Sequence, residues 1–452
     1  MVEPAWPRLP KQHRQEILEN NNLEDRISAL PNPVLCHILS FVPTKTAVRT
    51  TVLSPGWRHL WKNLNTLDFS DDSHELFDET GESFKRFANF VNNVLDKRNE
   101  PHDIHVLRLS CGHSNFDPVN ASSISAWVRA TIGPNLKEFT LTLFANDALG
   151  FVMPHSLLSC TKLVTLSLSG CIHVLPKYPL IVDLLSLKTL FMDIDYLDSF
   201  DEILKKCPVL ETLCASFVLK QPMRVCMPQT LKTLKLAIKN KVAAAIEVHA
   251  SGLACVSFAH AASNFNYIVG DLNNVTEVCL NIYATHEPIY VLLNLLDEIR
   301  MTKILALHRL TTKWLLQDRI QVFPDFDHLI RLEIIFPWFD STFLMSLLHR
   351  CYILQDLKIQ IEEELPIVSQ TWTEPTNDFP CLESCLSSFH FVGYLGIHDE
   401  TKFVGYILKR GLVLNTINID LDESLDINTK NDVLMKLFAM SRASPLCQAN
   451  IC

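Results

Sequence analysis

Glycine is scarce in this sequence, with 12 residues in 452, where about 7% is usual in globular proteins. Neither GxxxxGK[ST] nor GxGxxG occurs, which argues against a nucleotide site built on a glycine-rich loop. Basic residues form no run longer than a pair, such as Lys205-Lys206, and the net charge is −10. Because nucleic-acid binding needs a surplus of Lys and Arg on one face, we predict no nucleic-acid partner.

Long hydrophobic runs are also missing. No stretch of 18 apolar residues occurs, so we expect no membrane span and no membrane partner. The first 20 residues, MVEPAWPRLPKQHRQEILEN, lack the continuous apolar core of a secretion signal. We therefore expect a soluble cytoplasmic and/or nuclear protein whose 14 cysteines are reduced and buried.

Motifs for covalent chemistry are absent as well. The sequence has no Gly-x-Ser-x-Gly elbow and no Cys/His signature of a protease or a RING. The nearest approach to a metal site is His102-x-x-His105 followed by Cys111-x-His113, whose spacing fits no standard zinc pattern. We predict no catalytic residue, no cofactor and no metal site, and therefore no enzyme.

Three short amphipathic helices are predicted between residues 24 and 69. Asn32 is placed to cap a helix that Pro33 begins and Pro43 ends. A second helix contains Ala47, Val48 and Val52. Ser54-Pro55 opens a third helix with one apolar stripe, formed by Trp57, Leu60, Trp61 and Leu64. Helices this short are unstable alone, so their apolar faces need one another and a partner.

This stretch closely resembles an F-box, the helical module through which substrate receptors join SCF-type ubiquitin ligases. The resemblance rests on many positions in order: Leu30-Pro31, Val34-Leu35, Ile38-Leu39-Ser40-Phe41, Pro43-Thr44, Ala47-Val48-Arg49, Val52-Leu53-Ser54, Trp57-Arg58 and Leu60-Trp61. One site departs from plant F-boxes, because Pro55-Gly56 stands where a basic pair is usual.

The resemblance implies a Skp-type adaptor as partner and, through it, a cullin and a RING protein. The residues that it implies for adaptor binding are Leu30, Pro31, Leu35, Ile38, Leu39, Val48, Leu53, Ser54, Trp57 and Trp61. We also expect residues 1–70 to be separable from the rest of the chain.

From about residue 102 the sequence repeats the pattern Leu-x-x-Leu-x-Leu, mostly every 21 to 32 residues, which is typical of a leucine-rich repeat. A weaker copy begins at Ile304, with Arg309 in its third apolar position. The clear copies begin at Ile104, Leu136, Leu163, Leu187, Leu210, Leu231, Leu253, Val275, Leu329, Leu354, Leu386 and Leu414. Cysteine precedes three of them at Cys160, Cys207 and Cys351, and we interpret these thiols as core.

The last segment is similar to the FBD domain found at the C-terminus of many plant F-box proteins. The residues that carry this resemblance include Trp372, Phe379-Pro380-Cys381-Leu382, Ser384-Cys385-Leu386, Tyr406-Ile407-Leu408-Lys409 and Ser441-Arg442-Ala443-Ser444. We predict a helix at 400–409, a strand at 415–421 and a helix at 430–441. This segment is expected to cap the open end of the repeats.

The predicted fold is therefore α/β. An N-terminal tail (1–21) precedes a three-helix F-box (22–68) and a linker with a helix (69–101). An irregular leucine-rich-repeat solenoid (102–370) follows, with a parallel β-sheet and convex-side helices, and an α/β FBD-like segment (371–452) caps it. The three resemblances together imply a member of the plant F-box/FBD/LRR-repeat family.

The family resemblance implies the substrate-recognition subunit of an SCF-type ubiquitin ligase, with the repeats binding an unknown substrate protein. Two alternatives remain open: an adaptor-binding scaffold without ligase activity, and a hormone-like receptor with a small molecule on the concave face of the repeats. Aromatic residues crowd residues 314–343 and include Trp314, Phe336 and Trp338. Such residues occur at interfaces, but at helix and strand spacing they more often form core.

Overall fold

The computed structural model describes residues 27–70, 82–99, 103–111, 118–143, 151–174, 183–197, 200–262, 265–269, 272, 274–317, 322–362, 372–375 and 379–451. The chain divides into two compact units, Met1–Thr140 and Leu141–Cys452, and β3 (Glu138–Leu143) crosses the boundary between them. Among the described residues, no helix is both long and apolar enough to cross a bilayer.

The first unit opens with the predicted short helices. They are α2 (Asn32–Leu39) and α3 (Thr44–Arg49), followed by the 3-10 turns η1 (Thr50–Val52), η2 (Pro55–Trp57) and η3 (Leu60–Asn63). Asn32 does not cap α2, because the N-cap position belongs to Pro31 and no side chain caps the helix. The third helix is two separate turns, and glycine at position 56 disfavours a continuous helix there. Its predicted apolar stripe is nevertheless buried as expected.

A strand that the sequence analysis missed follows these turns. β1 (Thr66–Ser70) pairs in parallel with β2 (Val106–Cys111), and Leu67 lies opposite Leu107 while Phe69 lies opposite Leu109. Leu64, Leu67 and Phe69 are buried at the spacing of the repeat. The end of the F-box is thus also a rung of the repeat ladder. The unit also contains α4 (Glu82–Asp96) and α5 (Pro118–Thr131), joined by a hydrogen bond from Trp127 Nε1 to Asn92 Oδ1 (2.6 Å).

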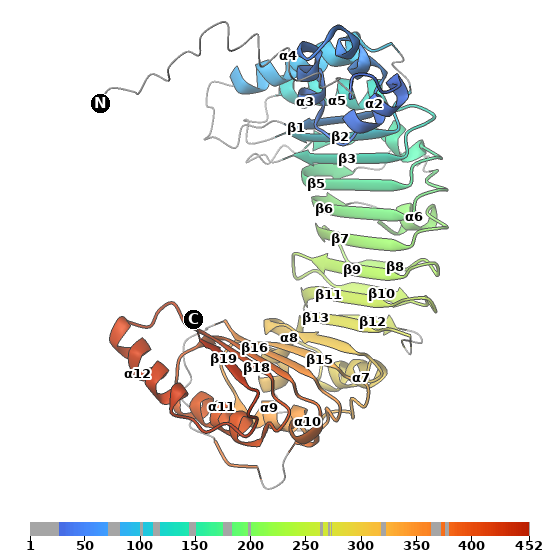
Figure 1. The fold of residues 1–452 in the computed structure, drawn as a ribbon. Helices are drawn as coiled ribbons and strands as arrows, with labels where there is room; N and C mark the ends of the chain where they lie inside the picture. Colours follow the sequence, from blue (N-terminus) through green and yellow to red (C-terminus); the bar gives the residue numbers. More distant parts are fainter. Residues whose placement is uncertain are drawn as a thin grey trace, which may run out of the picture. The chain divides into compact units, whose positions relative to one another are not determined.

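The second unit is a long parallel sheet whose strands lie side by side (Figure 1). Its strands in order are β5 (Thr165–Val174), β6 (Thr189–Leu197), β7 (Thr212–Val218), β9 (Thr233–Ile238), β11 (Cys255–Ala262), β13 (Glu277–Ala284), β14 (Ile304–Leu307), β15 (Arg331–Phe336), β16 (Asp356–Ile361), β17 (Ser388–Tyr394), β18 (Thr416–Leu421) and β19 (Gln448–Ile451), with β4 (Phe151–Val152) beside β5. Register places the second apolar residue of each repeat in one buried row, from Leu166 on β5 to Ile417 on β18.

The weaker repeat near residue 304 was predicted in the wrong register. The structure aligns Leu305 with Val278 and Leu332, and Leu307 with Leu280 and Ile334. Thr302, and not Ile304, therefore takes the first buried position. The Thr302 hydroxyl donates to the carbonyl oxygen of Ile304 (3.2 Å), which lets a polar residue occupy this site.

The layer behind the sheet begins with η4 (His155–Ser159) and α6 (Phe200–Lys205) and then changes to strands. β8 (Met223–Cys226), β10 (Ala244–Val248) and β12 (Phe265–Val269) form a three-stranded parallel sheet, so convex-side helices do not occur throughout. Ala244, Ile246 and Val248 are buried and alternate with more exposed residues, a period of two that favours a strand. Helices return as α7 (Tyr290–Glu298), α8 (Arg309–Gln317) and α9 (Ser341–Leu348).

The three repeated cysteines lie in the core, as predicted. Cys160, Cys207 and Cys351 are buried, and each thiol donates to the carbonyl oxygen four residues earlier, at 3.5, 3.3 and 3.3 Å. The thiol is small enough for the turn that leads into each strand, and its hydrogen bond satisfies the last turn of the preceding helical segment.

The FBD-like segment continues the same sheet with β17, β18 and β19 and adds α10 (Pro380–Ser384), α11 (His398–Arg410) and α12 (Ile427–Phe438) (Figure 1). The predicted helices and strand are present within three residues of the expected bounds. A glycine turn leads into α11: Gly396 has φ +73°, and a Cβ there would approach Val433 Cγ2 to 2.6 Å. The buried carboxylate of Glu400 accepts hydrogen bonds from the backbone amides of this turn.

Candidate functional site

The N-terminal helices have two apolar faces. Leu35 and Leu39 are one turn apart and both are buried, so they point into the first unit. Val34, Ile38 and Phe41 recur at helical spacing on another face, and their side chains are 42%, 43% and 77% exposed. Apolar residues therefore cover more of α2 than its own core requires. The second face is free to meet another protein.

Two further exposed residues extend this feature beyond α2. Val52 and Leu53, at the end of η1, are 85% and 64% exposed. Seven of the 23 exposed large hydrophobic side chains in the described residues fall between Ile27 and Leu53. We call Leu30, Val34, Ile38, Phe41, Val52 and Leu53 the apolar surface.

Hydrogen bonds from outside the helices fix the apolar surface in place. Trp57 is buried, and its Nε1 donates to Ser28 Oγ (2.8 Å), which ties the chain before α2 to η2. The Thr44 hydroxyl, also buried, accepts from the amide of Asp68 (2.8 Å) and so joins α3 to β1. The apolar surface is therefore carried by a packed support and not by isolated turns.

The charge around the apolar surface is of one sign. Residues 27–67 contain four cations and no Asp or Glu, in a chain whose net charge is −10. The cations are Lys45, Arg49, Arg58 and Lys62, the first three of which are exposed. A partner with an acidic rim would complement this segment.

The residues predicted for adaptor binding fall into three groups. Leu30, Pro31, Ile38 and Leu53 are exposed. Val48 and Ser54 are half-buried, whereas Leu35, Leu39, Trp57 and Trp61 are buried in the core of the first unit. In this arrangement the four buried side chains support the surface and do not form it. Adaptor contact by any of the ten stays a prediction.

Sequence reasoning left three exposed residues of the apolar surface, namely Val34, Phe41 and Val52, out of the predicted adaptor-binding set. Val34 and Val52 were placed with the apolar faces of their helices. The signal that could have revealed the second apolar face is the number of apolar positions in and just after α2. Apolar residues at 34, 35, 38, 39, 41 and 42 cover too much of a helix for a single stripe.

Other candidate sites are weaker. Of the metal candidate, His102 and His113 lie outside the described residues, while His105 contacts Asn65 Nδ2 (3.2 Å) and Asp103 Oδ1 (3.0 Å). No group of three or more His, Cys, Asp or Glu among the described residues is placed to hold a metal ion. In the aromatic segment, Trp314, Phe323, Phe326, Phe336 and Phe343 are buried, as core residues are, and Trp338 and Phe339 are half-buried.

Nine of the 13 described cysteines have thiols that are unsuited to nucleophilic chemistry. Burial raises the pKa of the thiols for which a shift is resolved, so they stay protonated and weakly nucleophilic at neutral pH. These residues are Cys36, Cys160, Cys207, Cys214, Cys255, Cys279, Cys351, Cys381 and Cys447. A catalytic cysteine that accepts ubiquitin needs the opposite shift.

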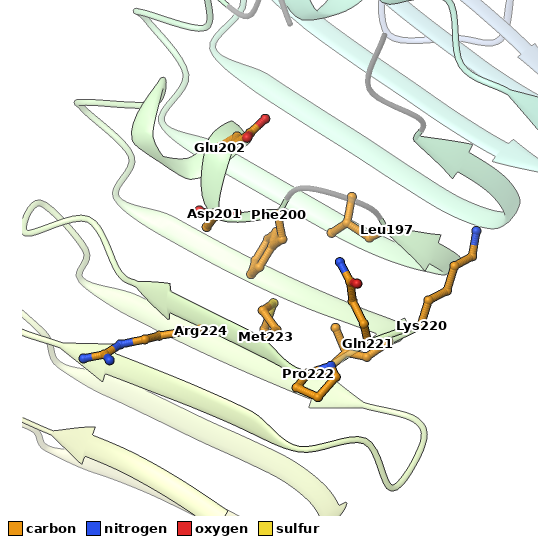
Figure 2. Close-up of a pocket in the computed structure, with 10 residues that line it drawn as sticks. Leu197, Phe200, Asp201, Glu202, Lys220, Gln221, Pro222, Met223 and Arg224 are labelled. Atoms are coloured by element: carbon orange, nitrogen blue, oxygen red, sulfur yellow. The ribbon is translucent and has the colours of Figure 1, made fainter. Parts of the chain in front are cut away.

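A cavity of about 290 Å³ opens between α6 and the segment 219–224. In Figure 2, Phe200 and Met223 face one another across it, while the ends of Glu202 and Arg224 point away. Two of the four charged residues that line it are in ion pairs: Asp201 with Lys205 (2.9 Å), and Arg224 with Glu247. The lining has no nucleophile with a base beside it, so the cavity carries no catalytic arrangement.

Comparisons with known proteins agree with this geometry. The F-box domain family matches residues 27–69, and the FBD family matches residues 374–419. A repeat family described as "FBD-associated F-box protein At5g56370, LRR repeats" matches residues 124–267. FBD-associated F-box protein At4g10400 of Arabidopsis thaliana is 30% identical over 443 residues, which cover 94% of this chain and 99% of that protein. The chain belongs to the F-box/FBD/LRR-repeat family.

Two further members of the family are similar to this chain over nearly its whole length. F-box/FBD/LRR-repeat protein At4g26340 of A. thaliana is 28% identical over 438 residues, covering 93% of this chain and 98% of the relative. FBD-associated F-box protein At3g52670 of the same plant is 29% identical over 454 residues, covering 94% and 96%. The match to this family thus extends over the F-box, the repeats and the FBD segment together.

Proposed function

We propose that this chain is the substrate-recognition subunit of an SCF-type ubiquitin ligase in the cytoplasm or nucleus. The apolar surface binds a Skp-type adaptor, which links the chain to a cullin and a RING protein, and the repeats bind a substrate protein. The chain itself catalyses nothing. Its contribution is proximity, because tethering raises the effective concentration of substrate lysines beside the ubiquitin-carrying enzyme.

The observation that carries this proposal is the apolar surface between Leu30 and Leu53, which is exposed on a packed support in a segment (27–67) whose Asp, Glu, Lys and Arg residues are all cations. Leaving so much apolar area in water is unfavourable unless a partner covers it. Central apolar residues of an interface typically contribute most of the binding energy, while a surrounding charged rim sets association rate and specificity.

We expect the double substitution Leu30→Ala and Pro31→Ala to weaken adaptor binding at least tenfold. Both side chains are exposed at the start of α2, so their truncation removes contact area without opening a core cavity. Titration of the full chain against a plant Skp-type adaptor by calorimetry measures the effect. The matched control is Leu412→Ala with Val413→Ala, an exposed apolar pair of the second unit, which should leave the affinity unchanged.

Gly56→Arg should strengthen adaptor binding by up to a few-fold. A Cβ at position 56 meets only Ser54 Oγ, at 3.7 Å, so a long side chain enters open space. The added cation extends the existing positive charge and restores a feature usual in plant F-boxes. The gain should shrink as salt is raised from 50 to 300 mM, because the effect is electrostatic. Weaker binding at every salt concentration would contradict an acidic partner surface at this point.

Co-purification distinguishes ligase function from scaffolding. The tagged chain is isolated from plant cells with proteasome inhibited, and the eluate is probed for adaptor, cullin and ubiquitin conjugates. If the chain is a ligase subunit, the adaptor, the cullin and the ubiquitin conjugates all co-purify with it. A scaffold brings the adaptor without cullin or conjugates, and a hormone-like receptor brings its substrate only when a small molecule is supplied.

A further inference from the structure

Part of the exposed face of the sheet in the second unit is covered mainly by small side chains. Two rows of outward residues cross the neighbouring strands β6, β7, β9 and β11 in register. One row is Phe191, Cys214, Lys235 and Ser257, and the other is Asp193, Ser216, Ala237 and Ala259. Five of these eight residues are small. They form the floor of a hollow of about 390 Å³, which we call the small-residue hollow and define by Cys214, Ser216, Ala237, Ser257 and Ala259.

The same face is closed elsewhere by larger, paired side chains. On β15 and β16, Arg331 lies 2.9 Å from Asp356, and Lys358 lies 2.8 Å from Glu333. These pairs cover the outward positions of their strands and satisfy one another. The small-residue hollow instead leaves the sheet surface open across four strands, a width of about 14 Å at the usual strand spacing.

The rim of the small-residue hollow includes one apolar side chain, Phe191, and one cationic side chain, Lys235. Phe191, on β6, is 42% exposed. Lys235, on β9, is exposed and forms no ion pair with any residue that the structure describes. At the far end of the strands, Lys239 reaches from β9 to Asp193 on β6 (2.8 Å) and so closes one side.

The surroundings of the hollow are neutral on an acidic chain. The four strands and the residue that precedes each of them carry three lysines and three carboxylates, against a net charge of −10 for the whole chain. The only carboxylate that lines the hollow, Asp193, is paired with Lys239. Burial raises the pKa of the Cys214 thiol, so the floor itself carries no negative charge. Lys235 is left to attract an anion from outside.

We infer that the small-residue hollow binds an extended protein segment in which a large apolar or aromatic side chain stands beside an acidic residue. The apolar side chain enters above Ala237 and Ala259 against the Phe191 ring, and the carboxylate reaches the Lys235 ammonium. This inference rests on the proposed substrate-recognition role and names the class of substrate sequence.

Size favours a peptide over a whole small-molecule ligand. A hollow of this volume lies at the low end for ligand pockets and is open across the strands, so it encloses one or two side chains. An extended chain advances about 3.3 Å per residue, so about four residues span the four strands. Phe191 and Lys235 lie two strand spacings apart, about 10 Å, so side chains at positions i and i+2 of such a segment, which project to the same side, can reach both.

A peptide array tests the inference directly. It carries 12-residue peptides with a central Trp, Phe or Leu, flanked by Asp and Glu in one set and by the isosteric Asn and Gln in the other. We expect the purified full chain to bind the acidic set at least tenfold more strongly than the amide set. Lys235→Glu and Ala237→Trp should each reduce acidic-set binding to background, the first by reversing the charge and the second by filling the floor.

The matched control is Lys206→Glu, the same charge change at an exposed lysine outside the hollow, which should stay within twofold of the unmodified chain. Equal binding of both peptide sets, binding of neither, or full binding by folded Lys235→Glu would overturn the inference. Adaptor capture is measured on the same preparations. Acid-dependent peptide binding by a chain that captures no adaptor would reject the proposed function alone.

Discussion

Replacing Val34 and Ile38 with aspartate should abolish adaptor binding while the fold stays intact. Both side chains are exposed on one face of α2, so the substitutions open no cavity in the free chain. In a complex they would place two carboxylates in the middle of an apolar contact, where desolvation costs several kcal/mol. We expect the affinity to fall at least 100-fold, which corresponds to about 2.7 kcal/mol.

Calorimetric titration against the adaptor measures this loss, and far-ultraviolet circular dichroism with tryptophan fluorescence verifies the fold. Ile427→Asp with Met435→Asp makes the same charge change at two exposed apolar residues of α12 and should bind the adaptor normally. Leu35→Asp, in contrast, should unfold the first unit because its side chain is buried. Normal affinity in a folded Val34/Ile38 variant would refute the assignment of the apolar surface.

The second large effect concerns the buried carboxylate of Glu400. Its Oε2 accepts from the amides of Leu395 (3.0 Å), Gly396 (2.8 Å) and Ile397 (3.3 Å), while Oε1 is buried without a partner among the described residues. Burial raises the pKa of Glu400 to about 8, although the three amides pull it down. The folded chain therefore holds a proton that the unfolded chain releases near pH 4.5.

The sign of the pH effect follows from this proton. Because the folded state binds it more tightly, the stabilisation is fully present below pH 4.5 and is lost as the pH rises to about 8. The loss amounts to at most about 5 kcal/mol. Glu400→Gln cannot release a proton, so its free energy of unfolding should fall much less over this range, whatever constant cost the amide adds.

Urea titrations of the full chain from pH 4.5 to 8.5 measure the two slopes. Glu423→Gln, the same change at an exposed glutamate, should keep the slope of the unmodified chain. If Glu400→Gln and the unmodified chain lose stability in parallel, Glu400 is ionised throughout and its three amide bonds outweigh its burial.

The repeats could be predicted because their period fixes which side chains are buried. Where a repeat lost its leucine, the pattern alone chose the wrong register, as at Thr302, because a buried threonine bonded to its neighbour looks like a surface residue in sequence. The strands β8, β10 and β12 were missed for a related reason. These strands lie in segments where the family pattern implies helices, and in β10 the local alternation of buried and more exposed residues favours a strand.

The candidate site was only partly predictable. Its location followed from the F-box pattern, but the division of α2 into a buried and an exposed face depends on which side packs against η3. Leu35 and Leu39 took the inner face, and their neighbours Val34 and Ile38 took the outer. The spacing of apolar residues alone cannot tell which of the two faces is buried, since the residues of both faces repeat at the same interval.

The strand β1 limits how genes of this type can recombine. Its residues Leu67 and Phe69 lie against Leu107 and Leu109, so a crossover between residues 64 and 70 would join an F-box to a β2 edge from another ancestor. Removal of residues 1–70 would leave the β2 edge bare, and bare apolar edges promote aggregation. Recombination that yields a folded protein should therefore place its crossover before Leu64. The strand β1 should then be inherited together with the repeats and not with the helices that precede it.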